Sequence, residues 1–401
     1  MATTTPSFEA ALSFARELIR IPSPPGAEGD VAERVRRELE ALAFQDVHLD
    51  AAGNVLGRIP GTGSGPSVML SCHLDVVSEG DPSAWDHPPF SGAVEDGFLH
   101  GRGAMDIKGP LALQTHAAAR LKGRASGDVW VAHTVLEERG GLGMQHLMES
   151  GEVKPAAVII GEATHGDVCI GHRGRGEVEI VIHGLAGHAS APARALNALS
   201  LLPAVLEAVF WELRGDQPSD ALLGAATVAA TSVEVSPASR NVIPDEVVVA
   251  LDWRVLPDAT DEALLARVRD VLDARLPELP EGFGVEVRMS RETQRTWTGL
   301  ERERKLFTPG FLMDPDAPVV RAAAAAVGTR DGSEAARIRP WTFATDGGWT
   351  HGVHGVPTLG FAPGEERYAH TNRERLDLEE ARWAYERYPA LVMAIQESLE
   401  R

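Results

Sequence analysis

The chain has 401 residues, which is too long for one ordinary hydrophobic core and suits two domains. It has 38 Lys and Arg against 58 Asp and Glu, and the net charge of −20 argues against nucleic acid and anionic membranes as partners. Only two cysteines occur, no stretch is long enough to span a membrane, and no basic region in Met1–Ser7 leads into an apolar core. These features favour a cytoplasmic protein.

The first part of the chain alternates short apolar runs with amphipathic helical patterns. This alternation is typical of an α/β fold whose sheet has buried, largely parallel strands. In chain order we expect a helix after Ser7, a helix over 31–42, strands near 47–49, 54–59 and 68–72, a helix over 107–121, a strand ending at Glu137, a helix near 142–148 and a strand over 156–160.

After Gly174 the pattern changes to strands that alternate charged and apolar residues. The expected order is a strand over 177–182, a helix over 195–213, strands over 225–235 and 246–254, a helix over 261–276 and a strand over 284–289. This is the β-α-β-β-α-β order of a ferredoxin-like domain. We therefore predict one domain formed by 1–174 and 291–401, with a smaller domain inserted at 175–290.

The larger domain resumes after this insertion. A helix is expected over 315–327, strands near 342–345 and 358–361, and a last helix from Leu378. The stretch 293–312 is rich in turn residues and carries no predicted element.

Side chains that bind metals follow directly after several predicted strands. His73, Glu137, Glu138 and Glu162 all occupy such positions, and strand ends are where an open α/β sheet places its site. Two adjacent carboxylates at a strand end can converge on one site, where one binds a metal and the other moves protons. A set of imidazole and carboxylate ligands without thiolate suits Zn²⁺, with Co²⁺ or Mn²⁺ as substitutes.

Three further residues complete a possible dinuclear centre. Asp106 lies in the glycine-rich segment 101–109 and His370 in a late loop, which gives enough ligands for two ions that share a carboxylate. Asp75 is placed to accept the other N–H of the His73 imidazole and so to fix its tautomer. Each residue alone is typical of a surface or a turn, and only the combination favours a metal site.

Five segments resemble the successive metal-site motifs of the M20 metallopeptidase family. They are 73–75, 101–109, 137–138, 161–164 and 369–371. That family includes acetylornithine deacetylase, succinyl-diaminopimelate desuccinylase, aminoacylase and glutamate carboxypeptidase. The segments 80–85, 171–174 and 360–366 look most like a little-characterised branch of the family that is linked to selenium metabolism.

The resemblance implies two Zn²⁺ per subunit and a role for each motif residue. Glu137 would be the general base. Asp106 would bridge the two ions, one of which would be held by His73 and Glu162 and the other by Glu138 and His370.

Two positions depart from the family pattern. Ala163 stands where the family usually has proline, which predicts a looser loop around Glu162. Glu374 follows His370 at a greater distance than the family's acidic residue does.

The inserted domain would be the lid and dimerisation domain of the family. Its segment 187–192 resembles the lid motif, in which a histidine reaches into the partner subunit's site and polarises the scissile carbonyl. The resemblance therefore assigns His188 a catalytic role and implies a homodimer formed through the inserted domain.

Four residues are predicted to bind substrate. Arg254 could bind a substrate carboxylate with two hydrogen bonds, or it could form a structural ion pair with Asp252, and the sequence leaves both open. The other three are Arg173, Asn241 and Thr345.

The predicted activity is hydrolysis of an amide in an N-acyl amino acid or a short peptide with a free carboxylate. The alternative within the family is an exopeptidase, either carboxypeptidase or dipeptidase, rather than a deacylase. An M28-type aminopeptidase lacks the inserted domain, and a non-catalytic binding protein would have lost the base or a ligand. A structural metal site would favour thiolate or imidazole ligands.

Overall fold

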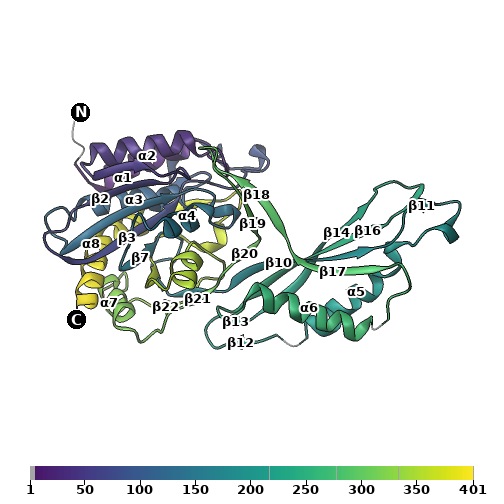
Figure 1. Cartoon of the computed structure of the whole chain (residues 1–401). Helices are drawn as coiled ribbons and strands as arrows, with labels where there is room; N and C mark the ends of the chain where they lie inside the picture. The colour runs from purple at the N-terminus through teal and green to yellow at the C-terminus, as the bar shows by residue number, and fades with distance from the viewer. Residues whose placement is uncertain (1–4, 216, 277, 333, 401) are drawn as a thin grey trace. The chain divides into compact units, whose positions relative to one another are not determined.

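The computed structural model describes residues 5–400 except 216, 277 and 333, so the start of Met1–Ser7 lies outside the described residues. The chain divides into two compact units (Figure 1). The first unit comprises Met1–His172, Gln294–Arg302 and Phe311–Arg401, and the second comprises Arg173–Thr293 and Glu303–Gly310. The sequence places 303–310 in the larger domain, whereas the structure pairs β20 (Phe307–Thr308) with β10 (Gly174–His183) of the second unit.

The first unit is built on an eight-stranded sheet with the order β1-β2-β6-β3-β7-β23-β8-β22. The central strands β6, β3, β7 and β23 run parallel to one another, and β1 and β2 are antiparallel additions. The predicted α/β class with a mostly parallel sheet is confirmed. The strands are β1 (Gln45–Leu49), β2 (Val55–Ile59), β3 (Gly65–His73), β6 (Gly127–Thr134), β7 (Ala157–Ile160), β8 (Val168–Cys169), β22 (Ile338–Arg339) and β23 (Thr358–Gly360).

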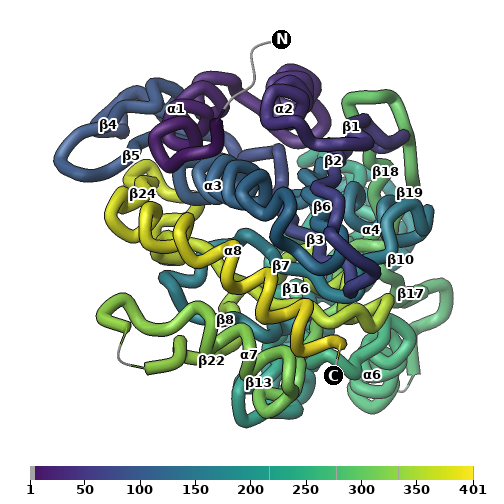
Figure 2. The backbone as a smooth tube through the Cα atoms, turned by 90° about the vertical axis from the view of Figure 1, so that its left-hand side faces the viewer, coloured from purple at the N-terminus to yellow at the C-terminus, as the bar shows by residue number. Residues whose placement is uncertain are grey.

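Helices cover this sheet. Helix α3 (Lys108–Ala119) and helix α8 (Leu378–Glu400) pack against β3, while α1 (Phe8–Ile19) packs on α3 and α7 (Pro318–Val327) on α8 (Figure 2). Every residue of α3 is buried, since helices and sheet surround it. The remaining helices of the unit are α2 (Gly29–Ala41), beside β1 and β2, and α4 (Leu142–Ser150).

The central strands are apolar on both faces, as parallel strands between helix layers are. All four residues of β7 are buried, and Val68, Met69 and Leu70 of β3 are fully buried. Because β3, β6 and β7 are parallel, their carboxyl ends lie at the same edge of the sheet. That edge is where the residues that the sequence predicts as metal ligands emerge.

The second unit has a five-stranded antiparallel sheet, in which four strands follow the order β14-β16-β10-β17 and β20 pairs with one end of β10. The chain order is β10, α5 (Leu202–Ala208), β14 (Thr227–Ser236), β16 (Glu246–Val255), α6 (Asp261–Arg275) and β17 (Gly284–Met289). This is the predicted ferredoxin-like arrangement. Residues of β16 alternate between buried and partly buried positions, because helices cover one face of the sheet only.

Short elements complete both units. They are β4 (Ala93–Glu95), β5 (Phe98–His100) and β24 (Arg375–Asp377), which form a small sheet, together with β9 (Gly171–His172), β11 (Gly187–His188), β12 (Ser219–Asp220), β13 (Gly224–Ala225), β15 (Val242–Ile243), β18 (Arg291–Arg295), β19 (Glu301–Lys305) and β21 (Phe311–Leu312). The stretch 293–312, left without elements by the sequence, thus takes part in four short strands.

Two predicted elements differ from the structure. The helix expected over 195–213 is broken into the 3-10 turn η4 (Ala198–Ser200), α5 and the π-helical turn η5 (Val209–Leu213). The strand expected near 342–345 was wrong. The backbone N–H of Thr345 donates to the ring Nε2 of His172 (3.1 Å), so it is not available to a neighbouring strand.

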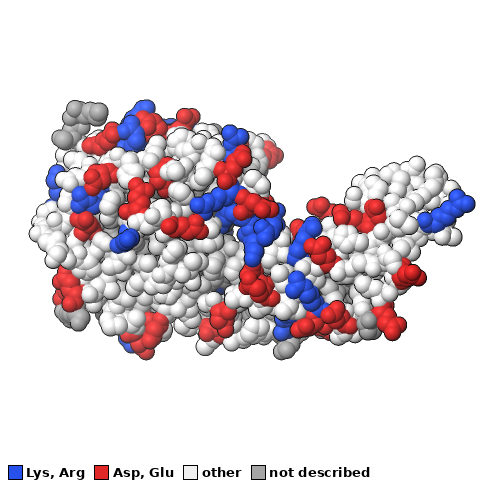
Figure 3. Space-filling view, viewed as in Figure 1, with Lys and Arg blue, Asp and Glu red and all other residues white. Residues whose placement is uncertain are grey.

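Charged side chains of both signs are interspersed on the face that Figure 3 shows, without one large patch of either sign. Among the described residues, no helix is both long enough and apolar enough to cross a membrane.

Candidate metal centre

Three parallel strands bring the predicted metal ligands to one edge of the sheet. Strand β3 ends at His73, and β7 is followed by Gly161 and Glu162. After β6 the chain turns at Leu136, whose φ of 56° is left-handed, and enters the 3-10 turn η2 (Glu137–Arg139). This turn carries both glutamates to the same edge.

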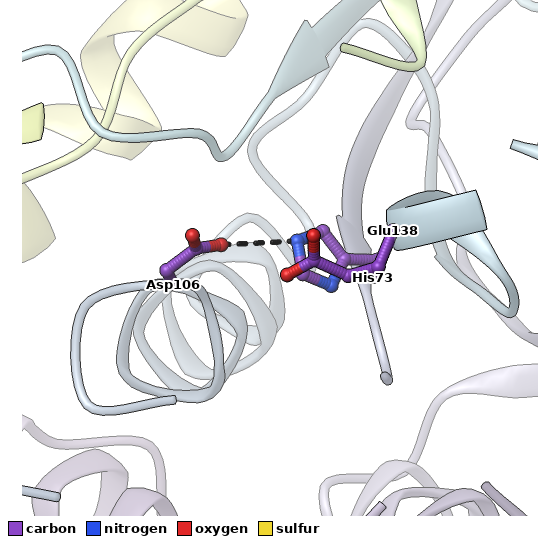
Figure 4. A group of neighbouring side chains, drawn as sticks. All are labelled: His73, Asp106 and Glu138. Atoms are coloured by element: carbon purple, nitrogen blue, oxygen red, sulfur yellow. Dashed lines mark hydrogen bonds and ion pairs between the residues drawn. The ribbon is translucent and has the colours of Figure 1, made fainter. Parts of the chain in front are cut away.

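Asp106 lies between the two histidines. Its Oδ1 is 3.2 Å from Nε2 of His73, and its Oδ2 is 3.2 Å from Nε2 of His370. Each carboxylate oxygen therefore faces a different imidazole, which is the arrangement a bridging ligand needs. Figure 4 shows the His73 ring turned toward Asp106, with the Glu138 carboxylate beside it.

The two remaining predicted ligands each contact one histidine. Oε1 of Glu162 is 3.3 Å from Nε2 of His73, and Oε1 of Glu138 is 3.1 Å from Nε2 of His370. The structure thus links all the predicted ligands through the two imidazoles. Two triplets have ligand atoms within 4.8 Å of one another, namely His73, Asp106 and Glu138, and His73, Glu137 and Glu162.

The electrostatics of this cluster show an excess of negative charge. Burial, together with repulsion from Asp106, raises the pKa of Glu162 to about 7. Burial also raises the pKa of Glu137 well above its usual range; His73 opposes this, and Glu162 and Asp346 add to it.

The two imidazoles respond to the same charge in the opposite sense. Hydrogen bonds to the carboxylates of Asp106 and Glu138 raise the pKa of His370 to about 10. Burial lowers the pKa of His73, but its contacts with Asp106 and Glu162 outweigh burial and raise it well above its ordinary value. The carboxylates in this cluster outnumber the imidazoles, so the cluster carries an excess of negative charge. Such a set of imidazole and carboxylate donors is suited to divalent cations.

Asp75 acts differently from the sequence prediction. Nδ1 of His73 lies 2.8 Å from the main-chain oxygen of Asp75 and 3.7 Å from its carboxylate. The carboxylate instead accepts the backbone N–H groups of Glu137 and Glu138, each at 3.1 Å. The main chain therefore fixes the imidazole tautomer, and the side chain orients the turn that carries both glutamates.

The loop around Glu162 is held by hydrogen bonds, although Ala163 replaces the proline of the family pattern. The indole N–H of Trp341 donates to the carbonyl oxygen of Ala163 (3.1 Å), and the Arg339 guanidinium donates to the carbonyl oxygen of Thr164 (2.9 Å). These contacts restrain the loop from a separate part of the chain.

The structure adds a residue that sequence reasoning did not single out. Asp346 is buried and accepts a hydrogen bond from the hydroxyl of Thr134 (2.8 Å), and its charge raises the pKa of Glu137. A hint of it was present in the sequence, because Asp346 directly follows Thr345, which is one of the residues predicted to bind substrate. Thr345 itself is buried, and its hydroxyl oxygen accepts the N–H of Gly347 (3.0 Å).

The predicted lid residues belong to the second unit. His188 is exposed on β11, and its Nδ1 accepts a hydrogen bond from the Ser190 backbone (3.1 Å). The side-chain oxygen of Asn241 accepts a hydrogen bond from the hydroxyl of Ser239 (2.7 Å).

The two predicted substrate-binding arginines have partners within the second unit. Arg254 donates to the carboxylate of Asp252 (2.8 Å), which is the ion pair that the sequence left open. Arg173 donates to the carbonyl oxygen of Ala225 (2.7 Å).

Comparison with known proteins adds independent findings. Residues 69–394 match the model of peptidase family M20/M25/M40. The uncharacterized protein YgeY of Escherichia coli is 32% identical over 367 residues, which cover 90% of this chain and 88% of YgeY. Succinyl-diaminopimelate desuccinylase of Methylorubrum extorquens is 32% identical over 365 residues, covering 85% of this chain and 87% of that enzyme.

A solved structure has a similar fold. The M20 family metallo-carboxypeptidase Sso-CP2 from Sulfolobus solfataricus gives a TM-score of 0.74 at 17% sequence identity. The match covers 96% of this chain and 99% of that one.

Proposed function

Because this chain belongs to peptidase family M20/M25/M40 and is therefore a metal-dependent hydrolase, we propose that it cleaves an amide bond at a dinuclear zinc centre. The substrate would be an N-acyl amino acid or a short peptide with a free carboxylate. The observation that carries this proposal is the placement of Asp106 between two imidazoles, with the partly buried Glu137 near one of them, His73.

Two ions would share Asp106 in this centre. His73 and Glu162 would hold one, and Glu138 and His370 the other, with Co²⁺ or Mn²⁺ as possible substitutes for Zn²⁺. When bound, such ions polarise a substrate carbonyl and lower the pKa of a water molecule.

Glu137 would move the protons. Its raised pKa, together with its position next to His73 and Glu162, suits a carboxylate that takes a proton from the attacking water and returns it to the leaving amine. Asp75, through its hydrogen bond to the N–H of Glu137, would keep that carboxylate oriented.

The second unit would supply the remaining polar groups. His188 of the partner subunit would donate a hydrogen bond to the oxyanion that forms on the substrate. Arg254, Arg173 and Asn241 would bind the substrate's polar groups, and Thr345 would line the substrate side.

A homodimer through the second unit is supported by two features of that unit. Strand β14 lies at the edge of its sheet, so one side of its backbone has no paired strand in the described chain. Phe210 and Trp211 on η5 are exposed by 47% and 74%, which is unusual for large apolar side chains on a monomer.

The acyl group distinguishes two versions of the function. The desuccinylase relative favours a deacylase, and the similar fold of a carboxypeptidase keeps an exopeptidase as the alternative.

Location in the cytoplasm and membership of the selenium-linked branch stay predictions. A catalytically inactive binding protein is less well supported, because every predicted ligand and the base are present.

The test is a hydrolysis screen of N-acyl amino acids and dipeptides, run on zinc-loaded protein, on chelated protein and on zinc-loaded Glu137→Gln. We expect turnover that needs metal and that falls by about 10²–10⁴-fold in Glu137→Gln while metal content stays the same. Near-normal turnover in that variant would refute the role of Glu137, and metal-independent turnover would refute the centre itself.

A further inference from the structure

Arg102 and Glu374 form a buried ion pair between the loops that carry two ligands. Arg102 is 2% exposed and Glu374 is 1% exposed, and Nη1 of the arginine is 2.5 Å from Oε2 of the glutamate. Arg102 shares its loop with Asp106, and Glu374 follows the loop of His370. The pair therefore joins segments that lie far apart in the sequence.

Glu374 also binds the backbone of the bridging ligand. Its Oε1 accepts the N–H groups of Met105 and Asp106, each at 3.0 Å. Both residues precede the N-cap of α3, Ile107, so their N–H groups take no part in the hydrogen bonds of that helix. One carboxylate thus satisfies two buried donors and an arginine.

Arg102 connects a third segment to the same point. Its Nη2 donates to the main-chain oxygen of Ser78 (3.2 Å), and its guanidinium lies over the ring of Trp85 at 5.1 Å from the centroid. Ser78 and Trp85 belong to the stretch that follows His73 and Asp75.

The small sheet aligns the same loops. Strand β5 leads into the Asp106 loop, β24 leaves the His370 loop, and the two strands pair with Arg375 opposite His100. The N–H of Gly101 donates to the main-chain oxygen of Glu374 (3.3 Å), which extends the pairing to the residues of the ion pair.

Resting on the proposed dinuclear function, we propose that Arg102 and Glu374 are positioning residues that hold the loops of Asp106 and His370 at the spacing two metal ions require. A buried ion pair adds little net stability compared with apolar residues of the same size. Its contribution here is geometric: the guanidinium donates to both Glu374 and the main chain of Ser78, and the Glu374 carboxylate also accepts two backbone N–H groups, so the pair fixes the relative placement of three segments. Contacts of this kind beyond the ligands typically change metal affinity by about 10–100-fold.

The test is a Zn²⁺ titration in competition with a chromogenic chelator, on wild type, Glu374→Gln, Arg102→Met and the double variant. We expect each single variant to bind the more weakly held ion about 10–100-fold less tightly. The double variant should bind zinc more tightly than the product of the two single-variant reductions in affinity predicts. The reason is that neither a guanidinium nor a carboxylate is left unpaired when both are replaced. If Glu374→Gln does not fold, Arg102→Lys provides the test instead. This variant keeps the positive charge but lacks the planar guanidinium, so its zinc affinity should fall by a smaller factor.

Glu38→Gln is the matched control. Glu38 is 8% exposed and pairs with Arg34 and His116, away from the ligand loops in sequence. This variant should lower the denaturation midpoint of the metal-free protein without changing zinc affinity. The inference would be overturned if Glu374→Gln and Arg102→Met bound zinc as tightly as wild type and only their denaturation midpoints fell, as in the control. The ion pair would then have a structural role alone. If wild type itself takes up no zinc, both the proposed function and the inference fail.

Discussion

Replacement of Glu28, which is not itself a predicted metal ligand, by glutamine tests the electrostatic reasoning. Glu28 is fully buried, and its Oε1 accepts the N–H groups of Gly26 (2.9 Å) and Leu136 (3.2 Å). Its Oε2 has no hydrogen-bond partner among the described residues. Burial, and repulsion from Asp75, raise its pKa from 4.5 to about 7.

The sign and the size of the effect follow from this pKa. The folded state holds the proton more tightly than the unfolded chain, so the free energy of unfolding falls as pH rises from about 4.5 to about 7 and stays lower above that. The pKa difference corresponds to about 3 kcal/mol. Glu28→Gln keeps an oxygen for both N–H groups and removes the ionisation. We therefore expect it to be more stable than wild type by up to about 3 kcal/mol at pH 8 and nearly equal to it at pH 5.

The assay is urea denaturation followed by tryptophan fluorescence between pH 5 and pH 8, with a chelator present so that metal binding does not add its own pH dependence. Glu379→Gln, which removes an exposed carboxylate from the same unit, serves as the control and should show a difference that barely changes with pH. The reasoning would be refuted if the difference in free energy of unfolding between Glu28→Gln and wild type were the same at pH 5 and at pH 8.

Three further outcomes are expected. Since the raised pKa of Glu137 controls its ability to accept a proton, kcat/KM should fall as pH falls through that pKa, and a flat acid limb in a pH–rate profile would contradict this. Trp341→Phe removes the hydrogen bond to Ala163, so it should lower the free energy of unfolding by about 1 kcal/mol and weaken zinc binding. An unchanged zinc affinity in a chelator competition would show that this bond does not restrain the Glu162 loop. Trp211→Asp should halve the molar mass measured by light scattering if η5 lies in a dimer interface, and a wild-type protein that is already monomeric would exclude that interface.

The sequence by itself was sufficient for the class of fold and for finding the residues that the structure brings together in the candidate metal centre. Strands such as β3 and β7 are continuous apolar runs, and helices such as α1 have one apolar face, so local periodicity reveals both. His73 and Glu162 could be found because each lies at, or within two residues of, the end of such a strand. Local order also revealed the ferredoxin-like unit, since its elements follow one another along the chain.

Only the tertiary structure decided which atoms meet. Asp75 was expected to bind His73 through its carboxylate, but a neighbouring turn offers it two backbone N–H groups. Glu374 and Arg102 lie far apart in sequence and come together because β5 and β24 pair. Hydrogen bonds depend on distance and direction in space, and the local pattern of a sequence carries no record of a partner that folding brings from elsewhere in the chain.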